Sequence, residues 1–292
     1  MAALGGVLVL VLVLVAALAV ASTGGSGAAS HHRRGTATDS VVYAGLVAPR
    51  HRPSALDPRG VRTISRLIAL GLPVYCGGAR GNAVAFTFDD GPGVYTHYAL
   101  RKLAQAHERA TFFAVGRSIE ARPGLLRREL KLAAIGDHTY THSDLVALSN
   151  AELASELRRT KHLIERDSGQ PVDLFRPPYG AQNARVNQVA KRLGLLDIMW
   201  SFDSRDSLGA NYAGIIKNVE ADLRPGAIIL MHENRGQTIR ALTTVLPVLH
   251  RRHLRSVSVP ELFAIDPPSA AQVRRGLAGC YVPHGSSLTG AG

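Results

Sequence analysis

Short apolar runs of β-type residues alternate with longer helical patterns from Ala83 onward, and this alternation restricts the possible folds more than any other feature. Strands are expected over residues 84–88, 111–115, 172–175, 198–202, 228–231 and 256–259. Helices are expected over residues 98–107, a segment ending near Ala134, and residues 151–166, 183–193, 212–223 and 239–251. This order predicts an α/β fold with a mainly parallel sheet, open or closed into a barrel. Reactive residues in such folds lie at the carboxyl ends of strands.

The helix expected over residues 151–166 is amphipathic. Leu153, Leu157 and Ile164 fall on one stripe, and Asn150 stands at the position of an N-cap. We therefore expect this helix to pack one face against the sheet.

The apolar N-terminus predicts export. Leu4 to Ala21 carries no charge, and Ala19-Val20-Ala21 is a small-residue pattern suited to cleavage before Ser22. A run of about 18 residues also reaches the lower limit for a membrane-spanning helix. Residues 1–21 are thus expected to be a signal peptide or an N-terminal membrane anchor, with the rest secreted or held at the outer face of the membrane.

The remaining chain divides by composition into three parts. Residues 22–75 are rich in Ser, Gly, His, Arg and Pro without a sustained apolar period, which predicts a flexible linker. One folded domain is expected over residues 76–280, and a short tail over 281–292. Cys76 and Cys280, the two cysteines, would join the ends of this domain by a disulfide in an oxidising compartment. The alternative is two unrelated thiols.

The chain is basic, with 34 Lys and Arg against 22 Asp and Glu and a formal net charge of +12. Such a surface suits an acidic polymer, an anionic membrane or nucleic acid. Export argues against nucleic acid. Compositional bias that gives only a soluble surface is the other explanation.

The motif Thr87-Phe88-Asp89-Asp90-Gly91-Pro92 runs from an apolar strand into two adjacent carboxylates and a turn. Adjacent side chains at a strand end point in different directions. One carboxylate can therefore bind a metal while the other takes a proton from water. The alternative is a polar strand end before a turn.

The motif His138-Thr139-Tyr140-Thr141-His142 holds two imidazoles four residues apart. On a helical turn this spacing puts both rings on one side, where they can bind one cation. With one carboxylate they form three protein ligands and leave room for water, as catalytic zinc sites require. Surface or packing histidines are the alternative.

The motif Phe175-Arg176-Pro177-Pro178-Tyr179-Gly180 follows another apolar run, and its two prolines stiffen the backbone. Arg176 could orient a carboxylate bidentately, and the backbone N–H of Tyr179 could face a developing oxyanion. An ordinary turn is the alternative.

In this order the three motifs resemble those of the NodB-homology polysaccharide deacetylases, carbohydrate esterase family 4, over roughly residues 83–259. The resemblance implies a distorted (β/α) barrel and a divalent cation, usually zinc, bound by Asp90, His138 and His142. It implies that Asp89 is the general base and that Arg176 orients it.

Two later motifs, Asp203-Ser204-Arg205-Asp206 and Leu230-Met231-His232, also match the family. By resemblance His232 is the general acid and Leu230 lines a pocket for the acetyl methyl group. Asp206 corresponds to a carboxylate that contacts Arg176 and tunes the acid. Ser143 and Ser207 depart from the pattern, which usually has Pro and Trp there, and Ser207 removes an aromatic wall beside the expected active site.

The resemblance implies a metal-dependent hydrolase that removes N-acetyl groups from an amino-sugar polysaccharide. Peptidoglycan is the expected substrate because an exported chain with a long spacer suits the cell wall. The expected binding partner is the polysaccharide itself. Residues 1–21 could tether the protein to the membrane, and the protein is expected to be a monomer. The alternatives are an O-acetyl xylan esterase with the same site and a catalytically silent carbohydrate-binding relative.

Overall fold

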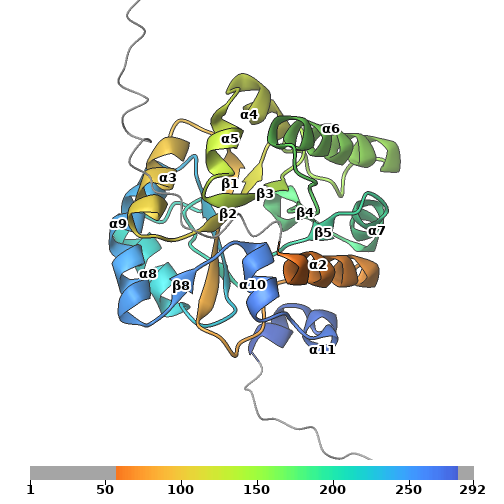
Figure 1. Ribbon diagram of the computed structural model, residues 1–292. Coiled ribbons are helices and arrows are strands. Elements are labelled where there is room, and N and C mark those ends of the chain that lie inside the picture. The colour runs from red at the N-terminus through yellow and green to blue at the C-terminus, as the bar shows by residue number, and fades with distance from the viewer. Residues whose placement is uncertain (1–56, 282–292) are drawn as a thin grey trace, which may run out of the picture. The chain divides into compact units, whose positions relative to one another are not determined.

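Eight parallel strands form one sheet within residues 57–281, the part of the chain that the computed structural model describes (Figure 1). Along the sheet the order is β5-β4-β3-β2-β1-β7-β6, and β8 pairs with β1. The bounds are β1 Ala83–Gly91, β2 Ala110–Ala114, β3 Ala133–Asp137, β4 Leu174–Phe175, β5 Leu196–Asp197, β6 Phe202–Asp203, β7 Ile228–His232 and β8 Arg255–Ser256. The expected α/β fold with a parallel sheet is confirmed.

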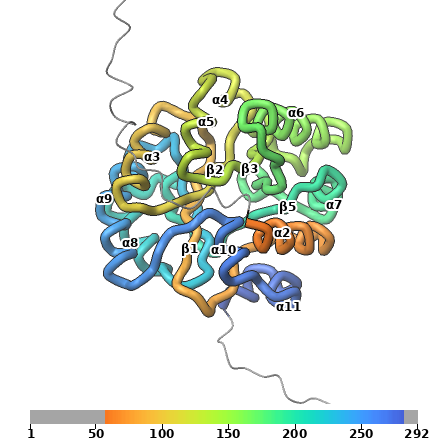
Figure 2. The backbone as a smooth tube through the Cα atoms, in the orientation of Figure 1, coloured from red at the N-terminus to blue at the C-terminus, as the bar shows by residue number. Residues whose placement is uncertain are grey.

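Helices alternate with these strands and pack around the sheet (Figures 1 and 2). They are α2 Pro58–Leu70, α3 Thr96–Gln105, α4 Gly116–Ala121, α5 Leu125–Glu129, α6 Asn150–Ser168, α7 Ala184–Arg192, α8 Tyr212–Ala221, α9 Gly236–Arg251, α10 Val259–Ile265 and α11 Ala270–Arg274, with 3₁₀ turns at Pro178–Gly180 and Gly276–Tyr281. Leu153, Leu157 and Ile164 of α6 are buried as expected. The N-cap of α6 is Ser149, which forms a capping box with Glu152, and the assignment of Asn150 was wrong.

The two faces of β1 have different roles because successive side chains of a strand point to opposite faces. Val84, Phe86 and Phe88 pack in the core cluster under the outer helices. Ala83 and Ala85 belong to the second cluster, inside the curved sheet. Thr87 and Asp89 continue this inner row, so the strand carries polar groups inward only at its carboxyl end.

Two expected elements were wrong around the sheet. The helix expected to end near Ala134 ends earlier, as α5 at Glu129, and Ala133–Asp137 forms strand β3, which pairs with β2. Sheet pairing outweighs the helix propensity of the preceding Leu- and Lys-rich residues. The strand expected over residues 198–202 is replaced by β5 and β6 on either side. The carbonyls of Ile198 and Met199 accept hydrogen bonds from the Arg176 side chain instead of from a neighbouring strand.

The linker expected over residues 22–75 was wrong for Pro58–Leu70, which forms α2. Asp57 caps this helix, and Ile64 and Leu67 are 1% exposed where α2 packs on α10. Gly60 permits this approach, since a Cβ there would lie 2.7 Å from the Pro260 carbonyl oxygen. A stripe of only three buried positions within a basic helix is too short to be recognised as an apolar period.

The segment after α2 helps to close the sheet into a distorted barrel. Val74 forms a parallel bridge with Ile198, just after β5, and Cys76 forms an antiparallel bridge with Ala227, just before β7. One bridge lies next to β5, at one end of the strand order, and the other lies next to β7, toward the opposite end. Residues 74–76 are therefore part of the domain and not of a linker.

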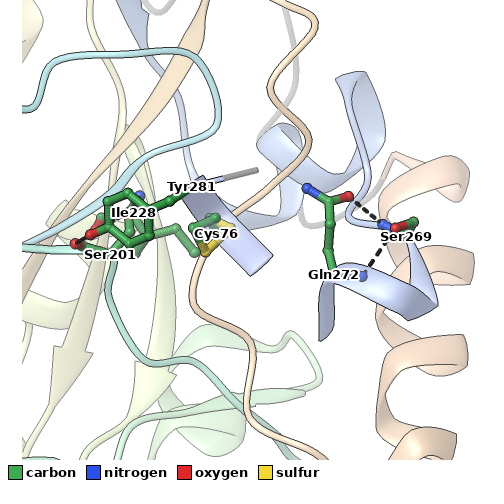
Figure 3. Close-up of a disulfide and its surroundings, with 7 residues drawn as sticks. Cys76, Ser201, Ile228, Ser269, Gln272 and Tyr281 are labelled. Atoms are coloured by element: carbon green, nitrogen blue, oxygen red, sulfur yellow. Dashed lines mark hydrogen bonds between the residues drawn. A yellow bond between two sulfur atoms is a disulfide. The ribbon is translucent and has the colours of Figure 1, made fainter. Parts of the chain in front are cut away.

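The disulfide between Cys76 and Cys280 is confirmed (Figure 3). It joins residues 204 positions apart, with their Cα atoms 5.9 Å apart. Next to it, the Tyr281 hydroxyl donates to the Ser201 carbonyl at 2.8 Å. The C-terminal turn is thereby attached to the segment that closes the sheet.

Several expectations lie outside the described residues: the signal peptide or anchor over residues 1–21, the linker up to residue 56, and the tail beyond Tyr281. Between residues 57 and 281, no helix combines the length and hydropathy that a membrane span requires.

Leu67→Ala should lower the free energy of unfolding by about 2–5 kcal/mol, because it removes a buried side chain between α2 and α10. Val61 is on the same helix and is 41% exposed, so Val61→Ala should change the free energy of unfolding by no more than about 0.5 kcal/mol. Urea unfolding of both variants measures the difference. Equal stability of the two variants would show that α2 does not contribute to the folded domain.

Candidate active site

A cavity of about 430 Å³ opens where β1, β3, β4 and β7 end. Seven of the nine candidate site residues line it: Asp89, Asp90, His138, His142, Tyr179, Leu230 and His232. The other two, Arg176 and Asp206, are buried and support residues of the wall. The expectation that the motifs meet at the carboxyl ends of the strands is confirmed.

Asp90, His138 and His142 converge on one point, with one ligand atom from each within 4.8 Å of the others. The Oδ1 atom of Asp90 lies 3.5 Å from Nε2 of His138 and 3.1 Å from Nε2 of His142. Two ligands that hold zinc tetrahedrally at about 2.0–2.1 Å are about 3.3 Å apart. Oδ1 is also buried and has no hydrogen-bond partner among the described residues. The donor set and its spacing therefore fit a divalent cation.

The surroundings of Asp90 favour the ionised form of its carboxyl group. Burial raises the pKa of this carboxyl, but the nearby rings of His138 and His142 and the charges of His138 and His232 outweigh burial and hold the pKa well below its usual range. A carboxylate that stays ionised is available to a cation at all ordinary pH values.

The two histidines lie in a loop after β3 and not on a helical turn, so the expected reason for their pairing was wrong. Thr139 and His142 have left-handed backbones, with φ of 65° and 62°. This loop geometry, rather than helical spacing, brings the rings together.

Side chains accept hydrogen bonds from the four backbone N–H groups of residues 139–142. Asp137 accepts from Thr139 at 2.7 Å, and Glu156 of α6 accepts from Tyr140 at 3.0 Å and Thr141 at 2.7 Å. The Thr139 hydroxyl accepts from His142 at 3.0 Å. Sequence reasoning missed both carboxylates. Asp137 directly precedes His138 and could have been noticed, whereas nothing in the sequence marks Glu156.

Hydrogen bonds on the far side of each ring orient the histidines. Nδ1 of His138 lies 2.8 Å from the Arg176 carbonyl, which can only accept, so Nδ1 carries the proton and Nε2 presents a lone pair. Nδ1 of His142 lies 3.2 Å from the Tyr179 hydroxyl. Such contacts fix the tautomer and ring orientation of metal-binding histidines.

Arg176 is completely buried and holds Asp89 in place. Its Nη1 donates to Oδ1 of Asp89 and to the Thr87 hydroxyl, each at 2.8 Å. The expected bidentate pair was wrong, because the other guanidinium nitrogens donate to backbone carbonyls. Burial lowers the pKa of Arg176, and the charge of Asp89 opposes this effect. Among the described residues no hydrogen bond is donated to Oδ2 of Asp89, which lies 3.7 Å from Nε2 of His138.

Asp206 pairs with His232. Its Oδ1 lies 2.7 Å from Nδ1 of the ring, while Oδ2 accepts from the His232 backbone N–H at 2.8 Å and from Thr238 at 2.6 Å. The expected contact with Arg176 was wrong: none of the hydrogen bonds or ion pairs of Asp206 within residues 57–281 involves that side chain. β4 and the loop after β6 lie on opposite sides of β1 and β7, which separates the two groups.

His232 is tuned to carry a proton. Burial lowers the pKa of its imidazole, but the hydrogen bond to Asp206 and the charges of Asp89, Asp206 and Asp90 raise the pKa to about 8. The pKa of Asp206 is lowered despite burial, by the same hydrogen bond and charge.

The other candidates lie as expected in the wall. Tyr179 is 74% exposed with φ of 61°, and no residue in the described range accepts a hydrogen bond from its backbone N–H. Leu230 is 4% exposed on the inner face of β7. Ser207 lines the cavity where the family usually has Trp. Three further motif residues also line the cavity: Pro177, Gly180 and Asp203. The sequence did not single out the remaining lining residues Trp200, Leu208 and Arg235.

Fold and site together define a (β/α) barrel with a two-histidine, one-aspartate centre at the carboxyl ends of its strands. The family model for polysaccharide deacetylases matches residues 77–197. The peptidoglycan-N-acetylglucosamine deacetylase PgdA of Listeria monocytogenes is 36% identical over 182 residues, 62% of this chain and 38% of the relative. A Bacillus cereus peptidoglycan-N-acetylglucosamine deacetylase is 36% identical over 186 residues, 61% of this chain and 87% of the relative.

Solved structures agree. The Bc1960 peptidoglycan N-acetylglucosamine deacetylase superimposes with a TM-score of 0.63 at 30% identity, covering 65% of this chain and 92% of that chain. BA3943 of Bacillus anthracis, described as a pseudoenzyme of the CE4 family, gives a TM-score of 0.62 at 29% identity, covering 65% of this chain and 68% of that chain. The chain belongs to the polysaccharide deacetylase family, carbohydrate esterase family 4. It spans little more than a third of the Listeria relative.

Replacing His138 and His142 together by Ala should abolish stoichiometric metal binding, because Asp90 alone offers one ligand. His162→Ala, an exposed histidine of α6, is the control and should bind metal as the unchanged protein does. Metal content after dialysis against zinc measures both. Undiminished metal in a folded double variant would contradict the assignment of these ligands.

Proposed function

We propose that this chain is a metal-dependent hydrolase that removes N-acetyl groups from an amino-sugar polysaccharide of the cell wall, with peptidoglycan as the first candidate. One observation carries the proposal: a single cavity contains an oriented carboxylate, a paired histidine of raised pKa and a three-ligand metal set. Amide hydrolysis needs a base, an acid and a stabilised oxyanion in one place.

The residues divide the reaction between them. Asp90, His138 and His142 would hold a divalent cation, which would supply an activated water and polarise the acetyl carbonyl. Asp89 accepts the proton of the attacking water on Oδ2, which Arg176 leaves free. The backbone N–H of Tyr179 faces the developing oxyanion. His232 gives its proton to the leaving amine as the carbon–nitrogen bond breaks, and the products are acetate and a glucosamine unit.

A catalytically silent relative is the alternative from another class, and BA3943 indicates that this fold alone does not guarantee activity. In the present chain the proposed base Asp89 and acid His232 are both present, and each is held by a buried partner. A purely binding role does not require these two pairs, so enzymatic activity is the better proposal.

Amide and ester substrates pass through the same kind of tetrahedral oxyanion, and an O-acetyl xylan esterase is the rival activity. The test is acetate release by the region from Asp57 onward, including α2, from peptidoglycan, chitooligosaccharides and acetylated xylan. Release from xylan alone would overturn the N-deacetylase proposal.

Three finer points belong to the same proposal. Zinc is the proposed native cation because two imidazoles and one carboxylate suit it. The protein is proposed to act outside the cell as a monomer, secreted or tethered through residues 1–21. The wall substrates in the names of the relatives and the disulfide support extracellular action.

Asp89→Asn should reduce kcat by about 10²–10⁴-fold, because the amide keeps the shape of the side chain but cannot accept the water's proton. Metal binding should persist, since Asp89 is not among the three ligands. Asp144→Asn, at an exposed acid in the loop after His142, should leave acetate release unchanged. Near-normal kcat in Asp89→Asn would mean that Asp89 only ends its strand.

Activity should fall as pH rises through the pKa of His232, because a general acid must start protonated. The alkaline limb of kcat/KM is therefore expected at about 8, above the unperturbed histidine value of about 6.5. Asp206→Asn removes the charge that raises this pKa, so the limb should move to lower pH. Because the pKa of His232 is raised in the folded state, its pairing with Asp206 stabilises the fold fully below the unfolded-state pKa of about 6.5. This contribution is lost as the pH rises through about 8.

His232→Ala should slow N-deacetylation more than hydrolysis of an activated acetate ester, since an amine anion is a far poorer leaving group than a stabilised alkoxide. Rates on both substrates measure this. Equal losses, together with an unmoved alkaline limb in Asp206→Asn, would reassign His232 to substrate positioning.

A further inference from the structure

Asn234 lies two residues after His232, in the turn between β7 and α9, and contacts the proposed metal centre from outside. Its Nδ2 donates to Oδ2 of Asp90 at 2.9 Å. A carboxylate oxygen only accepts, so the amide must turn its NH₂ group toward Asp90. None of the family motifs in the sequence includes this residue.

The two oxygens of Asp90 therefore have different environments. Oδ2 is occupied by the Asn234 amide, whereas Oδ1 is buried without a hydrogen bond and faces both histidines. Carboxylates bind cations through one oxygen or two. The amide occupies the second oxygen, and so it favours binding through Oδ1 alone.

The backbone around Asp90 places this contact. Asp89 is in register with His232 between the adjacent strands β1 and β7, and the Glu233 N–H donates to the Asp89 carbonyl at 3.1 Å. A Cβ on Gly91 would overlap the Glu233 carboxyl group, at 1.3 Å from its Oε1. The turn after β7 thus runs directly along residues 89–91 and fixes the position of Asn234.

Asp90 has a left-handed backbone with φ of 72°, a region that non-glycine residues rarely adopt. The direction of its side chain is therefore set by an unusual local geometry, and a partner in the turn after β7 can keep the side chain in that direction. Asn234 is the described residue that donates to its second oxygen.

We propose that Asn234 is a positioning residue that holds Asp90 as a one-oxygen metal ligand and links the metal centre to the strand carrying His232. This inference rests on the proposed metal-dependent function. The hydrogen bond is exposed, so its effect is on ligand geometry and metal affinity and not on the stability of the fold.

The test compares Asn234→Ala and Asn234→Leu with the unchanged chain. Leu keeps nearly the shape of Asn but cannot donate. Zinc affinity, measured by competition with a chelator, should fall at least about 10-fold in both variants, as for other partners of metal ligands. The melting temperature without metal should stay the same. Gln237→Ala, an exposed neighbour at the start of α9, is the matched control and should keep full zinc affinity.

Cobalt gives a second readout. If Asp90 is freed to bind through both oxygens, the coordination number rises and the visible absorption of the cobalt-loaded variants weakens. Unchanged zinc affinity and an unchanged cobalt spectrum in both variants would overturn the inference. Loss in Ala but not in Leu would also overturn it, since packing would then be the cause. Failure of the unchanged chain to bind zinc or cobalt would instead reject the proposed metal site itself.

Discussion

The buried guanidinium of Arg176 is the interaction on which the rest of the site depends. It donates to Thr87 and Asp89 on β1 and to the carbonyls of Ile198 and Met199 after β5. The carbonyl of the same residue orients His138. A charge this deep is tolerated only when it is paired and hydrogen-bonded, and leaving one without its partner typically costs about 3–5 kcal/mol. Arg176 thus connects the segment that closes the sheet with the orientation of Asp89, the proposed base, and of His138, a proposed metal ligand.

Strand register arranges the chemistry around this centre. Asp89 and His232 are partners on the adjacent strands β1 and β7, so the proposed base and the proposed acid face one cavity from neighbouring positions. A slip of one residue would turn one of them to the outer helices. The carboxylate cluster then raises the pKa of His232 against the effect of burial, and Asp206 supplies the nearest charge. The geometry that positions His232 therefore also raises its pKa.

Much of this arrangement could be predicted from residue patterns, and the failures have physical causes. The residues Ala133–Asp137 carry too short an apolar run to separate a strand from the end of a helix, and pairing with β2 decides the outcome. Ile64 and Leu67 of Pro58–Leu70 are buried because α10 and β5 lie against this helix. Asp206 was expected to contact Arg176, but the motif could not reveal that the order of strands places them apart.

The sequence alone shows the chemical groups as local motifs: adjacent carboxylates at the end of a strand, paired imidazoles, a proline-stiffened arginine loop and two cysteines. These features sufficed to identify the fold class, the family and the candidate groups. Which atoms meet was decided by folding in three dimensions. Glu156 supports the histidine loop and Asn234 contacts Asp90 from segments far away in the chain, and neither belongs to a motif. Single polar residues of this kind carry no periodic signal, because their role comes only from the backbone that the fold brings beside them.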